Sequence, residues 1–138
     1  MAETDVQLDA LARAEPAQLN EFAEGLIAAL GDIEVLYSRT GLVMLPMRDT
    51  ALGTVFHLGE VLVSEAHIRA GTCEGYGMRR GHDLEAAMAM ALVDLSLKSN
   101  VNAEACRSFC AALSAAQAEQ DQECLRRVEA TRVNMETF

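Results

Sequence analysis

The chain has 138 residues and 51% of them are hydrophobic, so it can bury a core as one domain over residues 1–138. Twenty-one acidic residues against eleven basic ones give a net charge of −10, which disfavours nucleic acids and anionic membrane surfaces as partners. Aromatic residues make up only 4% of the chain, so a base-stacking platform is not expected either.

The sequence also bears on the compartment. The N-terminal stretch MAETDVQLDA has no positively charged segment and no apolar one, so no secretory signal is expected. The longest uncharged apolar stretch, residues 86–93, is much shorter than the roughly 18 residues of a membrane-spanning helix. Without a signal, the four cysteines are expected to be reduced thiols, and a cytoplasmic protein is predicted.

The first predicted elements are helices. Thr4 and Asp5 can cap a short helix over residues 6–14. Pro16 then suits the first turn of a second helix, in which apolar residues recur at helical spacing. Gly31 is expected to end this helix as the residue after its last turn.

A sheet is predicted after Gly31, because the apolar residues change to strand-like alternation and short runs. Gly41 is expected to break the first two strands apart, and Pro46 to end the second or place it at an edge. A turn is predicted at residues 70–72, and the glycines at 75 and 77 suggest that something approaches the last strand closely. About four short antiparallel strands are expected, over residues 33–37, 42–45, 54–63 and 73–79.

Two C-terminal helices complete the expected fold. Asp83 is a good N-cap for the first of them, and Lys98 suits its last turn. The last helix is predicted from about Ala103 to Val133. Helices, then an antiparallel sheet, then helices predict an α+β fold.

A local basic segment is the best candidate for an anion site. Gly75-x-Gly77-x-x-x-Gly81 is neither a Walker loop nor a dinucleotide fingerprint. However, it carries Arg79 and Arg80 and leads into the helix that begins at Asp83, a combination that suits a phosphate or an acidic partner. The alternative is a tight turn whose arginines pair with nearby acids.

Cysteines offer a second candidate site. Cys106 and Cys110 lie four residues apart on one helix face, so they could ligate a metal or act as a thiol sensor. The sequence has no CxxC or HxxxH pattern to complete such a site. The alternative is that both thiols are small apolar core residues.

Histidines and acids do not complete an active site in the sequence. His57, His67 and His82 have no nucleophile motif beside them. Asp83 and Asp94 are eleven residues apart, or about 16 Å along a helix, too far for a catalytic carboxylate pair. Capping and surface roles are expected for both, and no self-contained active site is predicted.

Seven features stand in a characteristic order and spacing. They are LDALARAEPAQLNEF at residues 8–22, TGLVM at 40–44, FHLGEV at 56–61, GYG at 75–77, GHD at 81–83, the Ala-rich helix with Asp94, and RVEATRVNMETF at 127–138. Together they resemble the PhnG subunit of the bacterial carbon–phosphorus lyase system, and the resemblance covers almost the whole chain.

The resemblance implies a subunit of a cytoplasmic complex that holds PhnG, PhnH, PhnI and PhnJ in paired copies. With PhnI, PhnH and PhnL, such a subunit would be required to transfer phosphonate to the ribose of ATP with loss of adenine, forming ribose 1-phosphonate 5-triphosphate. It implies a required but non-catalytic subunit of this transferase complex, with no cofactor of its own. ATP, S-adenosylmethionine and an iron–sulfur cluster would belong to the wider complex.

Three positions depart from the family pattern, and one of them is Pro46, which interrupts what is usually a longer strand. Glu65 stands where a basic residue is frequent, and His82 stands where arginine is frequent, so Arg79 and Arg80 would have to supply the positive charge. Residues 86–93, with little charge and two methionines, are expected to suit burial against another subunit. The alternatives to the subunit are a stand-alone anion-binding enzyme and a thiol or metal sensor. Candidate anion or partner contacts are Glu60, Arg79, Arg80, His82 and Asp83.

Overall fold

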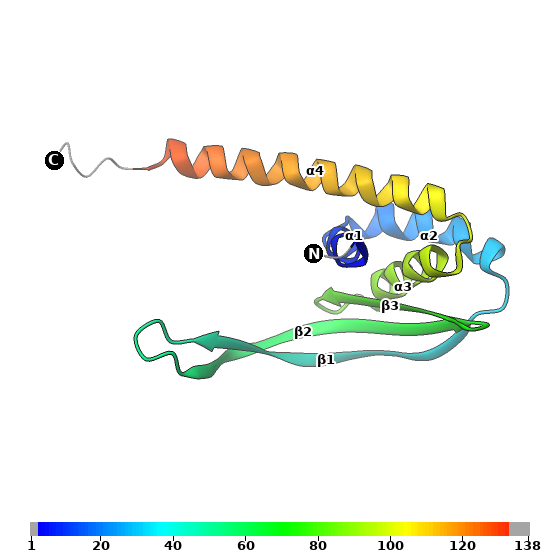
Figure 1. The fold of residues 1–138 in the computed structure, drawn as a ribbon, viewed down its shortest axis with the longest axis horizontal. Coiled ribbons are helices and arrows are strands. Elements are labelled where there is room, and N and C mark those ends of the chain that lie inside the picture. The colour runs from blue at the N-terminus through cyan, green and yellow to red at the C-terminus, as the bar shows by residue number, and fades with distance from the viewer. Residues whose placement is uncertain (1–2, 133–138) are drawn as a thin grey trace.

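The computed structural model describes residues 3–132 and gives them four helices and one antiparallel sheet with the strand order β1-β2-β3 (Figure 1). The α+β prediction is therefore confirmed, with three strands where about four were expected. The elements are α1 (Glu3–Ala12), α2 (Pro16–Leu30), β1 (Glu34–Arg48), β2 (Val55–Ala70), β3 (Cys73–Arg80), α3 (Leu84–Ser99) and α4 (Ala103–Ala130).

The strand count differs because β1 does not break at Gly41. This residue pairs with Val63 within one ladder that runs from Glu34 opposite Arg69 to Arg48 opposite Val55. The partner strand β2 is 16 residues long and supplies hydrogen bonds on both sides of the glycine. The two runs predicted at residues 33–37 and 42–45 are therefore one strand.

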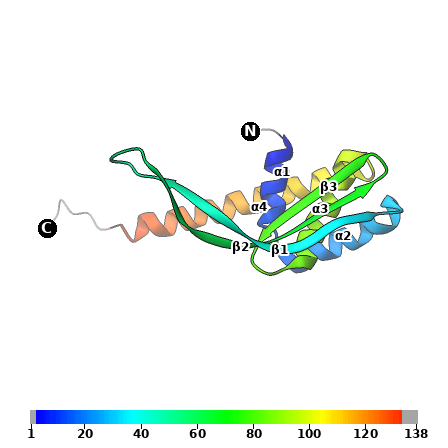
Figure 2. The same ribbon diagram turned by 90° about the horizontal axis from the view of Figure 1, so that it is seen from below.

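The C-terminal half of β1 and the N-terminal half of β2 continue beyond β3 as a two-stranded ribbon. β3 pairs only with residues 63–70 of β2, so residues 42–48 and 55–62 have no third strand beside them. We call these two segments the ribbon. It extends well past α1, α2 and α3 (Figure 2).

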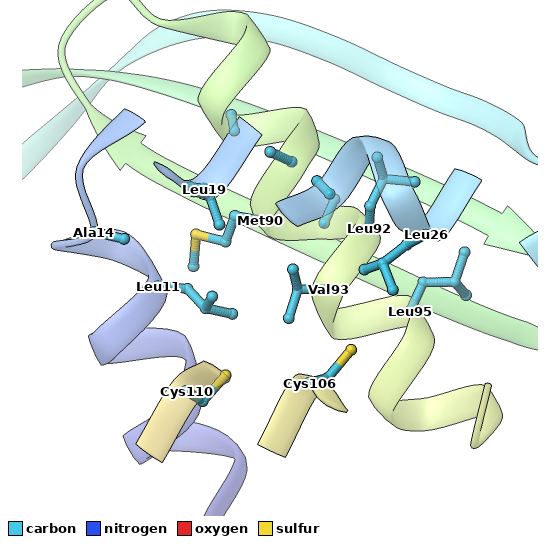
Figure 3. Packing of buried hydrophobic residues seen from close by; sticks show 14 of the residues in the cluster. Leu11, Ala14, Leu19, Leu26, Met90, Leu92, Val93, Leu95, Cys106 and Cys110 are labelled. Carbon is cyan, nitrogen blue, oxygen red and sulfur yellow. The ribbon is translucent and has the colours of Figure 1, made fainter. Parts of the chain in front are cut away.

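The core lies between the sheet and the helices, with α3 at its centre. Residues 86, 87 and 89–96 of α3 are all buried, as expected for a helix that is covered on every side. Leu11, Leu19 and Leu26 of α1 and α2 point toward α3, and Cys106 and Cys110 of α4 close the same cluster (Figure 3). All of residues 86–93 except the half-buried Met88 are thus buried inside this chain, so the expectation that they suit another subunit was wrong.

Two glycines of β3 let α3 lie directly on the sheet. A Cβ atom at Gly75 would come within 2.4 Å of the Ala91 carbonyl oxygen, and one at Gly77 within 2.2 Å of the Ala87 carbonyl oxygen. The predicted close approach at these glycines is therefore confirmed, and the approaching group is the backbone of α3.

Several helix ends agree with the sequence. Gly31 ends α2 with φ +77°, and the Asp83 carboxylate accepts a hydrogen bond from the Ala86 amide at 3.0 Å as the N-cap of α3. α1 begins at Glu3, so Thr4 and Asp5 lie within the helix and their prediction as caps was wrong. It ends at Ala12, before the predicted residue 14, because the chain turns at residues 13–15 before Pro16. The predicted end of α4 at Val133 lies outside the described residues.

α4 has a packed half and a projecting half. Its buried side chains are Ala103, Cys106, Cys110, Leu113 and Gln117. The Gln117 side-chain amide donates a hydrogen bond to the Ala10 carbonyl at 2.8 Å. The Arg13 guanidinium forms a bidentate ion pair with the Asp121 carboxylate, with hydrogen bonds of 3.1 and 2.8 Å. From residue 118 onward every described residue of α4 is exposed.

Candidate functional site

The Arg79 guanidinium is engaged inside the fold. It donates hydrogen bonds to the carbonyl oxygens of Leu11 at 2.5 Å and Ala14 at 2.7 Å, at the end of α1. Burial lowers the pKa of Arg79 from its ordinary value. The side chain thus adds a charged donor to the Leu11 carbonyl, which also accepts from the Ala14 amide at 3.2 Å, and supplies a donor to the Ala14 carbonyl just past α1.

The turn from Gly81 to Asp83 is held against the sheet. The buried Ser64 hydroxyl donates to the Gly81 carbonyl at 2.7 Å and accepts from the Asp83 amide at 2.9 Å. The Gly81 amide donates to the Leu62 carbonyl at 2.8 Å. These bonds fix the start of α3 at the point where β3 ends and the ribbon begins.

The remaining predicted contacts lie at this same junction. Arg80 and His82 are exposed, and neither has a side-chain hydrogen bond within residues 3–132. Glu60 is exposed on β2, two residues from Leu62, whose carbonyl is bonded to Gly81. The fold therefore brings Glu60, Arg80 and His82 toward the base of the ribbon, while Arg79 and Asp83 hold helix ends.

Replacing Arg79 with Ala should lower the free energy of unfolding by about 1–3 kcal/mol, because two carbonyls near the end of α1 lose a charged donor. The matched control is Arg80→Ala, an exposed change expected to stay within about 0.5 kcal/mol. Urea unfolding followed by circular dichroism measures both. Equal stabilities of the two variants would contradict the structural role of Arg79.

A polar and aromatic cluster covers the sheet face opposite α3. The Tyr76 hydroxyl donates to Glu65 at 2.6 Å, and the Arg39 guanidinium donates to the same carboxylate at 2.6 Å. Arg39 also lies 4.3 Å from the centre of the Tyr37 ring, which forms a T-shaped pair with the His67 ring. This cluster was not predicted, although the alternating Tyr37-Ser-Arg39 and Glu65-Ala-His67 patterns carry the signal.

The cluster should make stability depend on acid pH. Hydrogen bonds from Tyr76 and Arg39 lower the pKa of the Glu65 carboxyl below its ordinary 4.5. A depressed pKa in the folded state stabilises the fold above the unfolded-state pKa, and this gain is lost as pH falls through the folded value. The free energy of unfolding should therefore decrease below about pH 4.5 in part through this group.

Glu65→Gln should remove that part of the pH dependence, and the exposed acid Glu85 offers the matched control Glu85→Gln. Urea unfolding between pH 6 and roughly pH 3 measures the slope for each variant. If Glu65→Gln keeps the same slope as Glu85→Gln, the Glu65 carboxylate does not stabilise the fold.

Asp94 is a buried, hydrogen-bonded and ion-paired acid, which was not predicted from the sequence. It is 2% exposed, accepts a hydrogen bond from the Tyr76 amide at 2.9 Å and pairs with Lys98 at 2.9 Å. The surface role expected for Asp94 was therefore wrong. An acid within the apolar run of a helix, followed by a lysine four residues later, is the signal that could have indicated a buried pair.

The cysteines lie in different environments. Cys106 and Cys110 are buried on α4, and burial raises the pKa of the Cys110 thiol to about 11, so this thiol stays protonated near neutral pH. Cys73 is half-buried and Cys124 is exposed. Among residues 3–132, no group of three or more histidine, cysteine, aspartate or glutamate side chains could hold a metal ion.

Apolar side chains are exposed on the ribbon. They occur on both strands and at the tip, where Leu52 is 83% exposed. No helix in the described part of the chain is both long and apolar enough to span a membrane. The exposed apolar residues of the ribbon and its tip are Leu42, Val43, Met44, Leu45, Met47, Leu52, Val55, Phe56, Leu58 and Leu62.

Comparison with protein-family models gives a match over residues 5–138, to the model described as phosphonate metabolism protein PhnG. None of the curated proteins compared with the chain matches it. The match spans the sheet, the ribbon and all four helices except the first two residues of α1.

Proposed function

Because the chain belongs to the PhnG family and so has a role in phosphonate metabolism, we propose that it is a required, non-catalytic subunit of the carbon–phosphorus lyase core complex. In this proposal it assembles with PhnI, PhnH and PhnJ in paired copies in the cytoplasm and acts with PhnL. The assembly transfers phosphonate to the ribose of ATP with loss of adenine. ATP, S-adenosylmethionine and the iron–sulfur cluster are held by other subunits.

The family match along nearly the whole chain carries the proposal, and the exposure of the ribbon supports it. A contiguous apolar surface of this kind is typical of a chain that functions within an assembly. Of the predicted anion contacts, Arg79 is already bonded to carbonyls and Asp83 to the Ala86 amide. These bonds fit a supporting subunit better than a stand-alone anion-binding enzyme.

Co-expression with PhnI, PhnH and PhnJ tests the assembly. We expect the chain to co-elute with them in gel filtration at micromolar concentration. With PhnL, ATP and methylphosphonate added, chromatography should detect adenine release only when this chain is present. Elution as a separate species with all partners present, or unchanged adenine release without the chain, would contradict the proposal.

A further inference from the structure

We propose that the ribbon docks a folded subunit of different sequence through the side of the ribbon that faces the helices. This inference rests on the proposed function, since it assigns the surface by which the chain enters its complex. The surface follows from strand alternation, exposed area, the position of α4 and net charge.

Strand alternation identifies the side. Ser64, Ala66 and Ile68 of β2 are fully buried, and they face α3. Because side chains two residues apart share a face, Leu62 lies on this same side of the sheet. Its register partner Leu42 lies beside it.

The side changes from buried to exposed along the ribbon and stays mainly apolar. Leu42, Met44 and Leu62 are 62%, 55% and 43% exposed, since α3 does not reach them. Glu60, the register partner of Met44, lies on the same side and is its one acid before the register shift at Pro46. The helix-facing side of the ribbon is thus a continuation of the core surface that this chain leaves uncovered.

The exposed apolar area counts both sides of the ribbon. The exposed fractions of the ten apolar residues on the two sides and the tip correspond to on the order of 1,000 Å². The largest apolar patch on a typical monomer is about 300–600 Å². One partner's share of a standard protein interface is about 800 Å², so a partner seated on the helix-facing side must also contact the tip or the projecting half of α4 to reach it.

The projecting half of α4 lies on the same side of the molecule. It extends past the covered part of the sheet in the same direction as the ribbon in both views (Figures 1 and 2). The buried stripe of α4 that includes Leu113 and Gln117 continues, at helical spacing, to the exposed Cys124 and Val128. A folded partner seated on the helix-facing side of the ribbon would therefore also meet this half of α4.

Net charge favours a different chain over a second copy. Each copy carries −10, so pairing two copies brings like charges together. The ribbon segments themselves hold only two charged residues, Arg48 and Glu60, and Glu60 lies on the helix-facing side opposite Met44. A partner with an apolar patch and a net positive charge fits both properties.

The test compares a ribbon variant with a matched surface variant in the co-expressed complex of PhnI, PhnH and PhnJ. The ribbon variant is Leu42→Glu with Met44→Glu, and the control is Ile27→Glu, since Ile27 is 48% exposed on α2. The wild type and Ile27→Glu should co-elute equally. The amount of partner protein that co-elutes with the ribbon variant should be at least about tenfold lower than with the wild type at micromolar concentration.

A second measurement uses the unmodified complex and so does not depend on the variant folding. Amide hydrogen exchange in residues 42–48 and 55–62 should slow at least about tenfold on assembly, while exchange in residues 16–30 stays unchanged. If the wild type assembles but neither the ribbon variant nor ribbon exchange responds, the docking surface is wrong and the proposed function stands. If the wild type does not assemble, the proposed function fails.

A second copy would give a different result. The isolated chain would then form dimers at micromolar concentration, and Leu42→Glu with Met44→Glu would convert them to monomers. Light scattering measures both masses. A dimer that depends on the ribbon would overturn the assignment of a partner of different sequence.

Discussion

Replacing Gly77 with Ala is expected to lower the free energy of unfolding by about 3 kcal/mol, at the upper end of what overpacking costs. The new Cβ atom would lie 2.2 Å from the Ala87 carbonyl oxygen and 2.8 Å from the Ala91 amide nitrogen. Both are backbone atoms of α3, so no flexible side chain can move aside. The helix is buried on its far side as well, so it cannot retreat without disturbing the core.

Gly41→Ala is the matched control, since it adds the same methyl group to a strand glycine with no atom within 4 Å of the new Cβ. Its free energy of unfolding should stay within about 1 kcal/mol of the wild type, with a small gain expected from the reduced freedom of the unfolded chain. Urea unfolding by circular dichroism compares the two. Similar losses in both variants would contradict the close approach of α3 to β3.

Asp94→Ala is expected to lower the free energy of unfolding by about 3 kcal/mol. The change leaves the Tyr76 amide without its acceptor and leaves Lys98 without its ion-pair partner. Tyr76 belongs to the outer strand β3, where no further strand in the described residues can supply another acceptor. An unsatisfied amide of this kind contributes about 1–3 kcal/mol of the loss.

Two further variants separate the contributions at Asp94. Asp94→Asn keeps an oxygen for the Tyr76 amide but loses the charge, so its loss of stability should be smaller than that of Asp94→Ala. Glu85→Ala removes an exposed acid from the same helix and should change the free energy of unfolding by less than about 0.5 kcal/mol. If Asp94→Ala matches Glu85→Ala in urea unfolding, the buried pair does not stabilise the protein.

Features encoded locally could be predicted from the sequence. Helical spacing and a following glycine located α2 and its end at Gly31, and Asp83 was correctly predicted as an N-cap. The glycines of β3 indicated a close approach, although not which element approaches. These features depend on a few neighbouring residues, which is why local patterns suffice for them.

Features set by distant residues could not be predicted. Gly41 remains within a strand because β2 pairs on both sides of it, and this pairing joins segments more than twenty residues apart. Arg79 stabilises the end of α1 from a strand 65 to 68 residues later in the chain. Asp94 is buried because β3 presents the Tyr76 amide to it. In each case the deciding partner is given by tertiary structure and not by neighbouring residues.

Pro46 has a consequence for how the ribbon avoids aggregation. It lies within β1 opposite His57, and a proline is accommodated in a paired strand where its nitrogen faces away from the neighbouring strand. The outer edge of β1 therefore lacks one amide donor, and a strand from another molecule cannot form an uninterrupted ladder along it. Edge-to-edge pairing along β1 is thus interrupted at Pro46, while the side chains of the apolar faces stay available for recognition.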